Sequence, residues 1–314
     1  MGNSLSGYST TINVALIKKY SKKIIKKHNW SVADLFGDLV KRHPDKVIYY
    51  GETKMSYDEL DKLSNKVANW GLDIGLTKGD IIPLMLDNCP EFIATWLGLA
   101  KIGVSAALIN TNLSGNALKH CLMVALEQST IHVGHTYTVI LGDNYLERIH
   151  NIREGISNTY NVQYCTYTTG EIDDNIPLNG FNKTIKDRMD TPILSSQRSG
   201  VTFNDPVFYI YTSGTTGLPK AAKISHLRFA VAGYAFKKLY GVNSNDSIYI
   251  PLPLYHSNGG MLAVSLAWHA GTNIGLRNGF SASKYFPDCL KYGCTIGVYI
   301  GEICRYIAKT KPSE

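Results

Sequence analysis

Residues 211–220 read YTSGTTGLPK and lie between two apolar runs, DPVFYI (205–210) and AAKISH (221–226). The flanking runs predict strands, and the segment between them holds two glycines, three threonines, a serine, a proline and one lysine. Gly214 and Gly217 permit a positive φ, successive backbone N–H groups in such a turn can bind an anion, and Lys220 adds a positive charge. The combination suits a polyphosphate. Composition alone favours a plain connection between two strands, and only the order of the residues favours a phosphate loop.

The segment differs from the phosphate loop of the P-loop nucleoside triphosphatases. That pattern, G-x-x-x-x-G-K-[ST], needs a glycine before the lysine and a hydroxyl residue after it. This chain has Pro219 before Lys220 and Ala221 after it. The order of residues therefore excludes that class of loop.

Strands and helices are predicted to alternate on both sides of the loop. Ser56 followed by Glu59 forms a capping box, and Pro90 stands in the first turn of the next helix. Such alternation predicts an α/β fold with largely parallel sheets covered by helices. Strands are expected at 46–51, 79–87, 104–110, 130–134, on both sides of the loop, and at 247–252, 272–276 and 295–300. Helices are expected at 12–28, up to about 42, at 55–72, from 90 onward, and at 114–127, 226–240, 259–269, 282–291 and 302–309.

Two stretches depart from this pattern. Residues 135–204 contain polar, turn-rich segments such as EIDDNIPLNGFNKT (171–184), and we expect a variable loop region on the surface there. Residues 92–109, FIATWLGLAKIGVSAALI, resemble a weak membrane span in hydrophobicity. Lys101 and two glycines interrupt that run, so a buried helix followed by a buried strand is the favoured interpretation.

The charge of the chain is concentrated at one end. The net charge is +7, from 32 basic and 25 acidic residues. Residues 1–33 contain no acidic residue, and without their six lysines the chain has 26 basic and 25 acidic residues. A nearly neutral body argues against nucleic acid as a partner. The six cysteines form no C-x-x-C pair, which indicates a reducing compartment and no zinc site; no metal ligands are predicted.

In its order of residues, IYTSGTTGLPKAA (210–222) resembles the signature phosphate loop of the adenylate-forming, or AMP-binding, superfamily. Further segments resemble the branch of that superfamily formed by fatty acid transport proteins and very-long-chain acyl-CoA synthetases. The resemblance runs from about Trp30 to Glu314 and is weakest between 135 and 200. Its other segments are LGLAKIGVSAALINTNL (97–113), LPLYHSNGG (252–260), FSASKYFPDCLKYG (280–293) and CTIGVYIGEICRYI (294–307).

The resemblance implies a two-step ligase reaction that uses ATP, a fatty acid and coenzyme A, usually with Mg²⁺. A fatty carboxylate attacks the α-phosphate of ATP to give acyl-AMP and pyrophosphate, and the thiol of coenzyme A then displaces AMP. By motif, the ATP- and AMP-binding residues would be Tyr209, Ile210, Tyr211, Thr212, Ser213, Gly214, Thr215, Thr216, Gly217, Leu218, Pro219 and Lys220.

The same resemblance implies four residues near the acyl group. Tyr255 and His256 match a motif beside the acyl and adenylate pocket, and His256 would orient the carboxylate or act in catalysis. A buried structural histidine fits the sequence as well. Tyr299 and Gly301 match a segment near the acyl tunnel, where Gly301 would keep space, although a plain strand-to-helix turn is an equal alternative.

Several family segments have no match in this sequence. These are the adenine-contacting Y-G-x-T-E segment, the ribose-binding aspartate, the hinge, and the C-terminal lid domain with its catalytic lysine. We therefore expect 30–314 to be a partial AMP-binding domain without the lid, with little ligase turnover and a tendency to aggregate. The alternative function is a catalytically inactive, membrane-associated fragment that binds fatty acid or partners. The segment IGEICRYI (300–307) argues against a third function, an adenylation domain for amino or aryl acids.

The N-terminal segment 1–29 is basic and amphipathic. Its start, MGNSLS, fits the N-myristoylation pattern with Gly2 as the acceptor, although so short a pattern also arises by chance. One acyl chain needs a second signal for stable binding, which the lysines would supply at an anionic surface. We expect association with the cytoplasmic face of the plasma membrane or endoplasmic reticulum. Homo-oligomer formation is left open.

Overall fold

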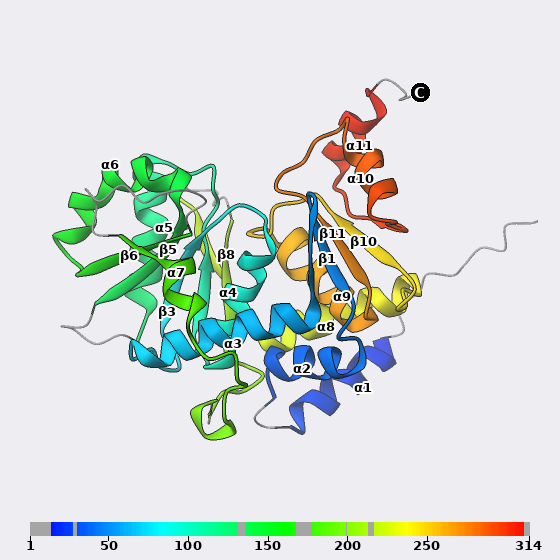
Figure 1. Ribbon diagram of the computed structural model, residues 1–314, viewed down its shortest axis with the longest axis horizontal. Helices are drawn as coiled ribbons and strands as arrows, with labels where there is room; N and C mark the ends of the chain where they lie inside the picture. Colours follow the sequence, from blue (N-terminus) through cyan, green and yellow to red (C-terminus); the bar gives the residue numbers. More distant parts are fainter. Residues whose placement is uncertain are drawn as a thin grey trace, which may run out of the picture.

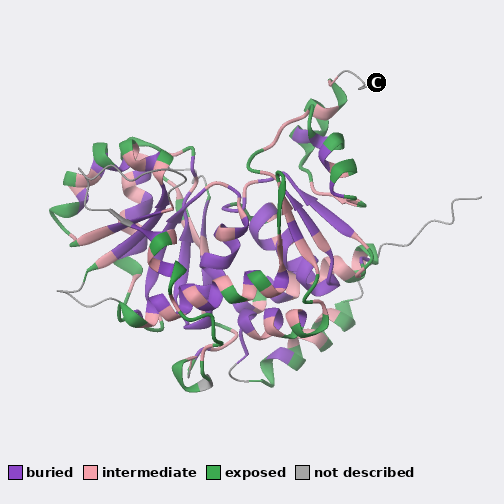
Figure 2. Ribbon diagram, viewed as in Figure 1, coloured by how far each residue is buried: buried purple, intermediate pink, exposed green. Residues whose placement is uncertain are grey.

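The computed structural model describes residues 14–27, 30–130, 136–167, 178–198, 200–212 and 217–310. Within them, two β-sheets lie side by side with helices between them and on their outer faces (Figure 1). Buried residues fill both sheets and the layer between them, and most exposed residues lie on the outer helices (Figure 2). This arrangement confirms the predicted α/β fold.

The larger sheet has seven strands in the order β7-β6-β5-β3-β4-β8-β9. Every neighbouring pair is parallel except β8 and β9, which are antiparallel and flank the YTSGTTGLPK segment. The strands are β3 (Ile81–Met85), β4 (Ser105–Leu108), β5 (Tyr137–Gly142), β6 (Val162–Tyr167), β7 (Leu178–Gly180), β8 (Pro206–Thr212) and β9 (Lys220–Ser225).

The smaller sheet has five strands in the order β12-β10-β11-β1-β2. Only the hairpin of β1 and β2 is antiparallel. The first strand, β1, pairs with β11, more than 200 residues later in the chain, so the smaller sheet joins both ends of the described chain. Its strands are β1 (Val47–Tyr50), β2 (Thr53–Ser56), β10 (Ser247–Ile250), β11 (Asn273–Leu276) and β12 (Ile296–Gly297).

The helices fall into groups by position. α1 (Val14–Ile25) and α2 (Val32–Arg42) lie beside α8 (His226–Tyr240), and α3 (Tyr57–Asp73) packs on α4 (Pro90–Lys101) (Figure 1). α5 (Gly115–Gln128) and α6 (Leu146–Ser157) cover the outer face of the larger sheet. The remaining helical segments are η1 (Asp143–Tyr145), α7 (Phe181–Lys186), η2 (Ser195–Arg198), η3 (Ser257–Ala263), α9 (Val264–Ala270), α10 (Tyr285–Lys291) and α11 (Gly301–Ala308).

An aromatic cluster occupies the layer between the two sheets. The ring of Trp96 on α4 lies 5.3 Å from that of Phe208 on β8 and 5.3 Å from that of Trp268 on α9. Phe229 on α8 and Phe36 on α2 complete the contacts with Trp268. Because this core contains residues of both sheets, the sheets share one hydrophobic core.

Most predicted elements are confirmed, including the capping box. The backbone N–H of Glu59 donates to the Ser56 hydroxyl at 3.1 Å, and the Ser56 N–H donates to the Glu59 carboxylate at 2.7 Å. The interpretation of 92–109 is also confirmed, since this run forms most of α4 and all of β4. Among the described residues no helix is long and apolar enough to cross a membrane.

The prediction of a loop region at 135–204 is wrong for much of its length, because β5, α6, β6, β7 and α7 lie within it. Polar residues are frequent there because α6 buries one narrow face, through Ile149, Ile152 and Ile156. The described part of 187–205 does lack strands and has a single short helix, η2.

Three boundaries near the C-terminal end also differ from prediction. The strand expected at 295–300 shrinks to Ile296–Gly297, which has one partner strand, β10. The helix expected at 282–291 begins at Tyr285. The helix expected at 259–269 is a π-helix up to Ala263 before α9 begins. Of the strand expected at 130–134, Thr130 is not in a strand, and 131–134 lie outside the described residues.

Candidate functional site

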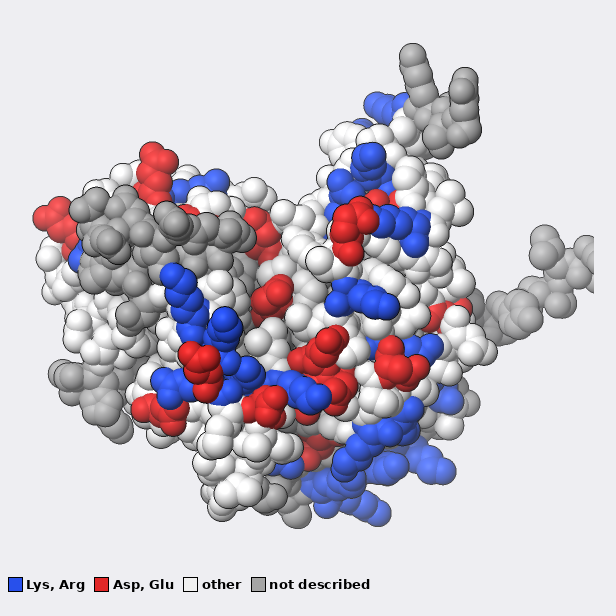
Figure 3. Space-filling view, viewed as in Figure 1, with Lys and Arg blue, Asp and Glu red and all other residues white. Residues whose placement is uncertain are grey.

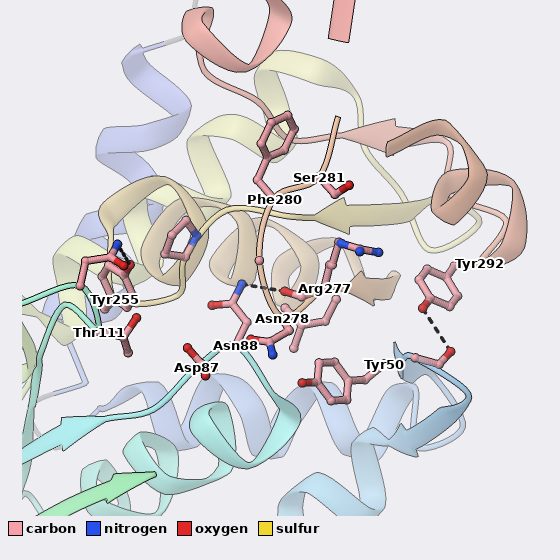
Figure 4. A pocket seen from close by; sticks show the side chains of 15 residues that line it. Tyr50, Asp87, Asn88, Thr111, Tyr255, Arg277, Asn278, Phe280, Ser281 and Tyr292 are labelled. Carbon is pink, nitrogen blue, oxygen red and sulfur yellow. Dashed lines mark hydrogen bonds between the residues drawn. The ribbon is translucent and has the colours of Figure 1, made fainter. Parts of the chain in front are cut away.

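A cleft with a volume of about 790 Å³ opens where strands of both sheets end (Figure 4). The larger sheet contributes the residues that follow β3 and β4, and the smaller sheet those that end or follow β1, β10 and β11. All five strands point their carboxyl ends toward it, which is where ligands bind in open α/β sheets. The lining side chains labelled in Figure 4 are Tyr50, Asp87, Asn88, Thr111, Tyr255, Arg277, Asn278, Phe280, Ser281 and Tyr292.

Asn88 joins the two sheets at the base of the cleft. Its side-chain amide donates to the carbonyl of Leu252 at 2.8 Å and to that of Arg277 at 2.9 Å. Its side-chain oxygen accepts from the backbone N–H of Leu254 at 2.7 Å. Asn88 is 2% exposed, so these bonds are shielded from water and fix the loops after β10 and β11 against the end of β3.

A carboxylate forms part of the wall next to Asn88. Asp87 accepts hydrogen bonds from the hydroxyl of Tyr145 at 2.5 Å and from the side chain of Asn144 at 3.2 Å. Burial raises the pKa of Tyr145 to about 12, and the bond to Asp87 adds to the shift. Arg148 donates to the carbonyl of Thr111 and holds the turn after β4. This wall therefore holds the side chain of Asp87 in a fixed position.

The opposite wall carries the one cation among the cleft-lining residues. Arg277 directly follows β11 and forms an ion pair with Asp288 at 2.6 Å. The hydroxyl of Tyr249 donates to the same carboxylate at 2.7 Å. The Arg277 side chain keeps 31% of its surface exposed, so its guanidinium is oriented while still reachable by an anion.

The YTSGTTGLPK segment leaves the sheet at the same edge. β8 is parallel to β4 with Leu108 opposite Ile210, so the chain after β8 starts beside the turn that supplies Thr111 to the cleft. Ser213, Gly214, Thr215 and Thr216 lie outside the described residues. Gly217 has φ +96°, which confirms the predicted need for glycine there.

The described arms of this segment are anchored to α5. The Tyr211 hydroxyl donates to the carbonyl of Cys121 at 2.8 Å, and the Nε2 of His120 lies 3.1 Å from the carbonyl oxygen of Pro219. Thr212 and Lys220 pair across β8 and β9, and both are exposed. Among the described residues no carboxylate lies within ion-pair distance of Lys220, so its charge is available to an anion.

The remaining members of the segment divide between the sheet and the surface. Ile210 is buried in the core between the sheets, and Tyr209 is half-buried on the other face of β8. Leu218 is 45% exposed and Pro219 is half-buried. Ile210 therefore acts through the position of the strand, and its side chain does not reach a ligand at this edge.

Tyr255 and His256 lie on the turn between β10 and the π-helix. Tyr255 is 5% exposed, lines the cleft and accepts a long hydrogen bond, 3.4 Å, from Asn112. Partial burial raises the pKa of Tyr255 and lowers that of His256. His256 keeps much of its surface exposed and is not among the cleft-lining residues, but its ring packs edge-on against that of Tyr255. A Cβ atom on Gly260 would lie 1.9 Å from the carbonyl oxygen of Leu254. Glycine is therefore required behind this turn.

Tyr299 and Gly301 do not line this cleft. Tyr299 is 59% exposed, and Gly301 begins α11, where a Cβ atom would meet nothing within 4 Å. Their assignment to an acyl tunnel stays a prediction. Gly2 lies outside the described residues.

Sequence reasoning missed four residues that hold the site together: Asn88, Tyr145, His120 and Arg277. The only local signal was the position of Asn88 and Arg277 directly beyond predicted strands. Within the described part of the chain, no group of three or more His, Cys, Asp or Glu side chains could hold a metal ion.

Comparison with known proteins relates this site to one family. The model of the family described as AMP-binding enzyme matches residues 36–314. Long-chain fatty acid transport protein 1 of Bos taurus is 33% identical over 314 residues, which cover 99% of this chain and 46% of that protein. Human long-chain fatty acid transport protein 6 is 34% identical, covering 95% of this chain and 46% of that protein. The chain thus spans about half the length of these curated relatives.

Solved structures share the fold at lower identity. The N-terminal domain of FACL13 from Mycobacterium tuberculosis, with an inhibitor bound, superimposes with a TM-score of 0.74 at 21% identity, covering 89% of this chain and 65% of that one. The anthranilate CoA ligase AuaEII, in complex with anthranoyl-AMP, gives a TM-score of 0.72 at 20% identity, covering 85% of this chain and 49% of that one. Since the family model matches most of the sequence, the chain belongs to the AMP-binding enzyme family.

Proposed function

We propose that this chain takes part in the ATP-dependent activation of a long-chain fatty acid. The fatty carboxylate attacks the α-phosphate of ATP, which forms acyl-AMP and releases pyrophosphate. The thiol of coenzyme A then attacks the acyl carbon, forms the thioester and releases AMP. The main support is the cleft at the carboxyl ends of five strands, with a glycine- and hydroxyl-rich segment starting at its edge.

The chain's own residues suit the charge of a nucleotide triphosphate. Thr212 and Lys220 would contact phosphate oxygens together with Ser213, Thr215 and Thr216, and Gly214 and Gly217 would let the backbone approach closely. Arg277 adds a cation on the wall of the cleft itself. Mg²⁺ binds mainly through phosphates and one or two carboxylates. Asp87 is the carboxylate among the cleft-lining residues and would be its ligand.

Tyr255 and His256 are proposed to contact the fatty carboxylate. Burial lowers the pKa of His256, which keeps its imidazole neutral near pH 7 and able to donate one hydrogen bond. Tyr255 adds a hydroxyl inside the cleft. Tyr299 and Gly301 would border the acyl chain further along.

Replacing Lys220 tests the proposed phosphate contact, and a second lysine on the same strand, Lys223, provides a matched control. Lys220→Ala should weaken ATP binding about tenfold or more, since a charged contact to phosphate is lost. Lys223 is also exposed and lies three residues along β9, so its side chain points to the opposite face of the sheet. Lys223→Ala should bind ATP as the unmodified chain does. Titration calorimetry with ATP measures both.

Release of pyrophosphate in the presence of ATP and oleate tests the chemistry. Formation of acyl-AMP supports a ligase that completes the first step. Binding of oleate without any pyrophosphate would favour the alternative, a catalytically inactive chain that binds fatty acid or partners. Equal ATP affinity of the Lys220→Ala and Lys223→Ala variants would overturn the proposed role of the loop.

We propose further that α1 contacts the cytoplasmic surface of a membrane. The lysines at positions 18, 19, 22, 23, 26 and 27 are all exposed, and residues 14–27 contain no acidic residue. Each such charge near an anionic leaflet contributes about 1 kcal/mol to binding. Binding to vesicles with and without phosphatidylserine tests this contact.

A further inference from the structure

A second cavity, of about 430 Å³, is lined by residues of α1, α2 and α8, and α1 and α2 lie on the opposite side of the molecule from α6 (Figure 1). Four cationic side chains line it, Lys23, Lys27, Arg42 and Lys237, against a single carboxylate, Asp38. Figure 3 shows Lys and Arg gathered over α1 at the lower right of the molecule, with few acidic residues among them. The cavity is distant from the strand ends that form the candidate active site, and no residue lines both.

Two of these four charges are held in place by backbone carbonyls, and none of the four is neutralised by a carboxylate among the described residues. Lys237 donates to the backbone carbonyl of His269 at 2.7 Å, and the Nε of Arg42 donates to the backbone carbonyl of Asp38 at 3.1 Å. None of the four cations forms an ion pair within the part of the chain that the structure covers. Burial lowers the pKa of Lys237, and the charges of Lys238 and Arg42 lower it further. An anion placed here would relieve that repulsion.

The floor of the cavity is neutral and aromatic. The rings of Tyr20 and Tyr234 stack with centroids 4.0 Å apart. The Nδ1 of His269 lies 2.8 Å from the carbonyl oxygen of Ser265, which requires an N–H at that position, so Nε2 accepts from the Tyr20 hydroxyl at 2.8 Å. A ligand in this cavity would therefore meet neutral aromatic side chains as well as cations.

The surroundings of the cavity favour a membrane-bound source for that anion. α1 also carries exposed lysines that do not line the cavity, including Lys18 and Lys22. Val14 and Ile25 on the same helix keep 56% and 43% of their surfaces exposed. A basic helix with exposed apolar side chains is typical of a segment that lies at a lipid interface. Binding of a soluble anion would require the cavity but none of these surrounding features.

We propose that this cavity binds the phosphorylated headgroup of an anionic phospholipid, one that carries a phosphate monoester. Such a group brings between one and two negative charges, which four converging cations match better than a phosphodiester does. The rest of the headgroup would lie against the side chains of Tyr20 and Tyr234. The inference rests on the proposed membrane contact of α1 and adds a discrete headgroup site to it.

Two double variants, each lacking a pair of lysines in or directly after α1, distinguish binding in the cavity from general attraction between the basic helix and an anionic surface. Lys23→Gln with Lys27→Gln removes two cavity charges four residues apart. Lys18→Gln with Lys22→Gln removes two exposed charges at the same spacing outside the cavity. Arg42→Gln tests the α2 side independently of α1. Co-sedimentation is measured with phosphatidylcholine vesicles containing either phosphatidylserine or phosphatidylinositol 4,5-bisphosphate at equal total charge.

The unmodified chain should bind the phosphoinositide vesicles about tenfold more tightly than the phosphatidylserine vesicles. The Lys23/Lys27 variant and Arg42→Gln should lose that preference, while the Lys18/Lys22 variant should bind both vesicles more weakly and keep it. Equal loss for all three variants would overturn the headgroup site and leave the membrane contact standing. No binding to either vesicle would overturn the membrane contact itself.

Soluble inositol 1,4,5-trisphosphate distinguishes the source of the phosphate. It should compete with the phosphoinositide vesicles but bind alone more weakly, since it lacks the contribution of the interface. Binding of the soluble compound as tight as that of the vesicles would overturn the lipid assignment. Thermal unfolding of each variant, expected within a few degrees of the unmodified chain, establishes that every sample is folded.

Discussion

Two buried histidines link the stability of this protein to pH. His226 is fully buried, and its Nδ1 accepts from the backbone N–H of Val32 at 3.1 Å. Burial lowers the pKa of His226 to about 4, outweighing the opposite effects of Asp205 and Asp34. Burial likewise lowers the pKa of His269 to about 4. Both rings are therefore neutral in the folded protein over a pH range in which they would take up a proton when unfolded.

Stability is expected to fall as the pH drops from about 6.5 to about 4. In that window the unfolded chain binds more protons than the folded one, so acid favours unfolding. His226→Asn keeps an acceptor for the Val32 N–H but cannot be protonated. Between pH 7.5 and pH 5, the free energy of unfolding of this variant should therefore fall by about 2 kcal/mol less than that of the unmodified chain. Urea unfolding at both pH values measures the difference, and equal losses would contradict the assignment to His226.

At the level of single residues, local signals predicted local roles. The capping box of Ser56 and Glu59 and the positive φ of Gly217 both follow from rules that span a few residues. Asn88 could not be predicted in this way, because its bonding partners lie 164 to 189 residues further along the chain. The phosphate-binding role of residues 213–216 rests on their order in the sequence and stays a prediction.

At the level of elements, a close approach of helices decides where glycine is needed. α3 and α4 pack so tightly that a Cβ atom on Gly98 would lie 2.5 Å from the carbonyl oxygen of Ser64 and 2.6 Å from the Cβ of Val67. Both obstacles belong to the body of α3 and cannot rotate away. Gly37, in the middle of α2, would instead have nothing within 4 Å of an added Cβ atom.

The same substitution should therefore have opposite effects at these two glycines. Gly98→Ala is expected to lower the free energy of unfolding by about 1–3 kcal/mol, because the helices must separate. Gly37→Ala should raise it by about 0.5–1 kcal/mol, since alanine favours the helix and meets no obstacle. Urea denaturation with circular dichroism measures both. A destabilised Gly37→Ala variant, or a neutral Gly98→Ala variant, would show that the packing differs from this description.

Elements were predicted best where they are buried on both faces. β3, α4 and β4 consist almost wholly of buried residues, and their apolar runs stood out in the sequence. β6, β7 and α7 lie toward the edge of the larger sheet, where polar residues are tolerated and hydrophobic periodicity is weak. The loop interpretation of 135–204 failed for that physical reason.

On the scale of the whole molecule, the layer between the sheets determines whether they fold together. Trp96 contacts β8 of the larger sheet through Phe208 and the helix that precedes β11 through Trp268. Trp96 is 1% exposed, and Trp268 is fully buried. The cluster around Tyr285 and Ile303 is separate and packs α10 and α11 on the smaller sheet. Removing a ring from the central layer should thus destabilise both sheets. Truncating a side chain in the outer cluster should destabilise only α10 and α11.

Trp96→Ala is expected to lower the free energy of unfolding by about 3–5 kcal/mol, because a large cavity replaces the indole. Native-state hydrogen exchange should show the same decrease for the amides of β4 and of β10, one strand from each sheet, if the shared core makes them one cooperative unit. Ile303→Ala provides the contrast: Ile303 is 6% exposed in the outer cluster, so its loss should speed exchange in α11 and leave β4 unchanged. If Trp96→Ala lowered the exchange protection of β4 but not that of β10, the two sheets would unfold as independent units. The cleft between them would then be free to change width as its ligands bind.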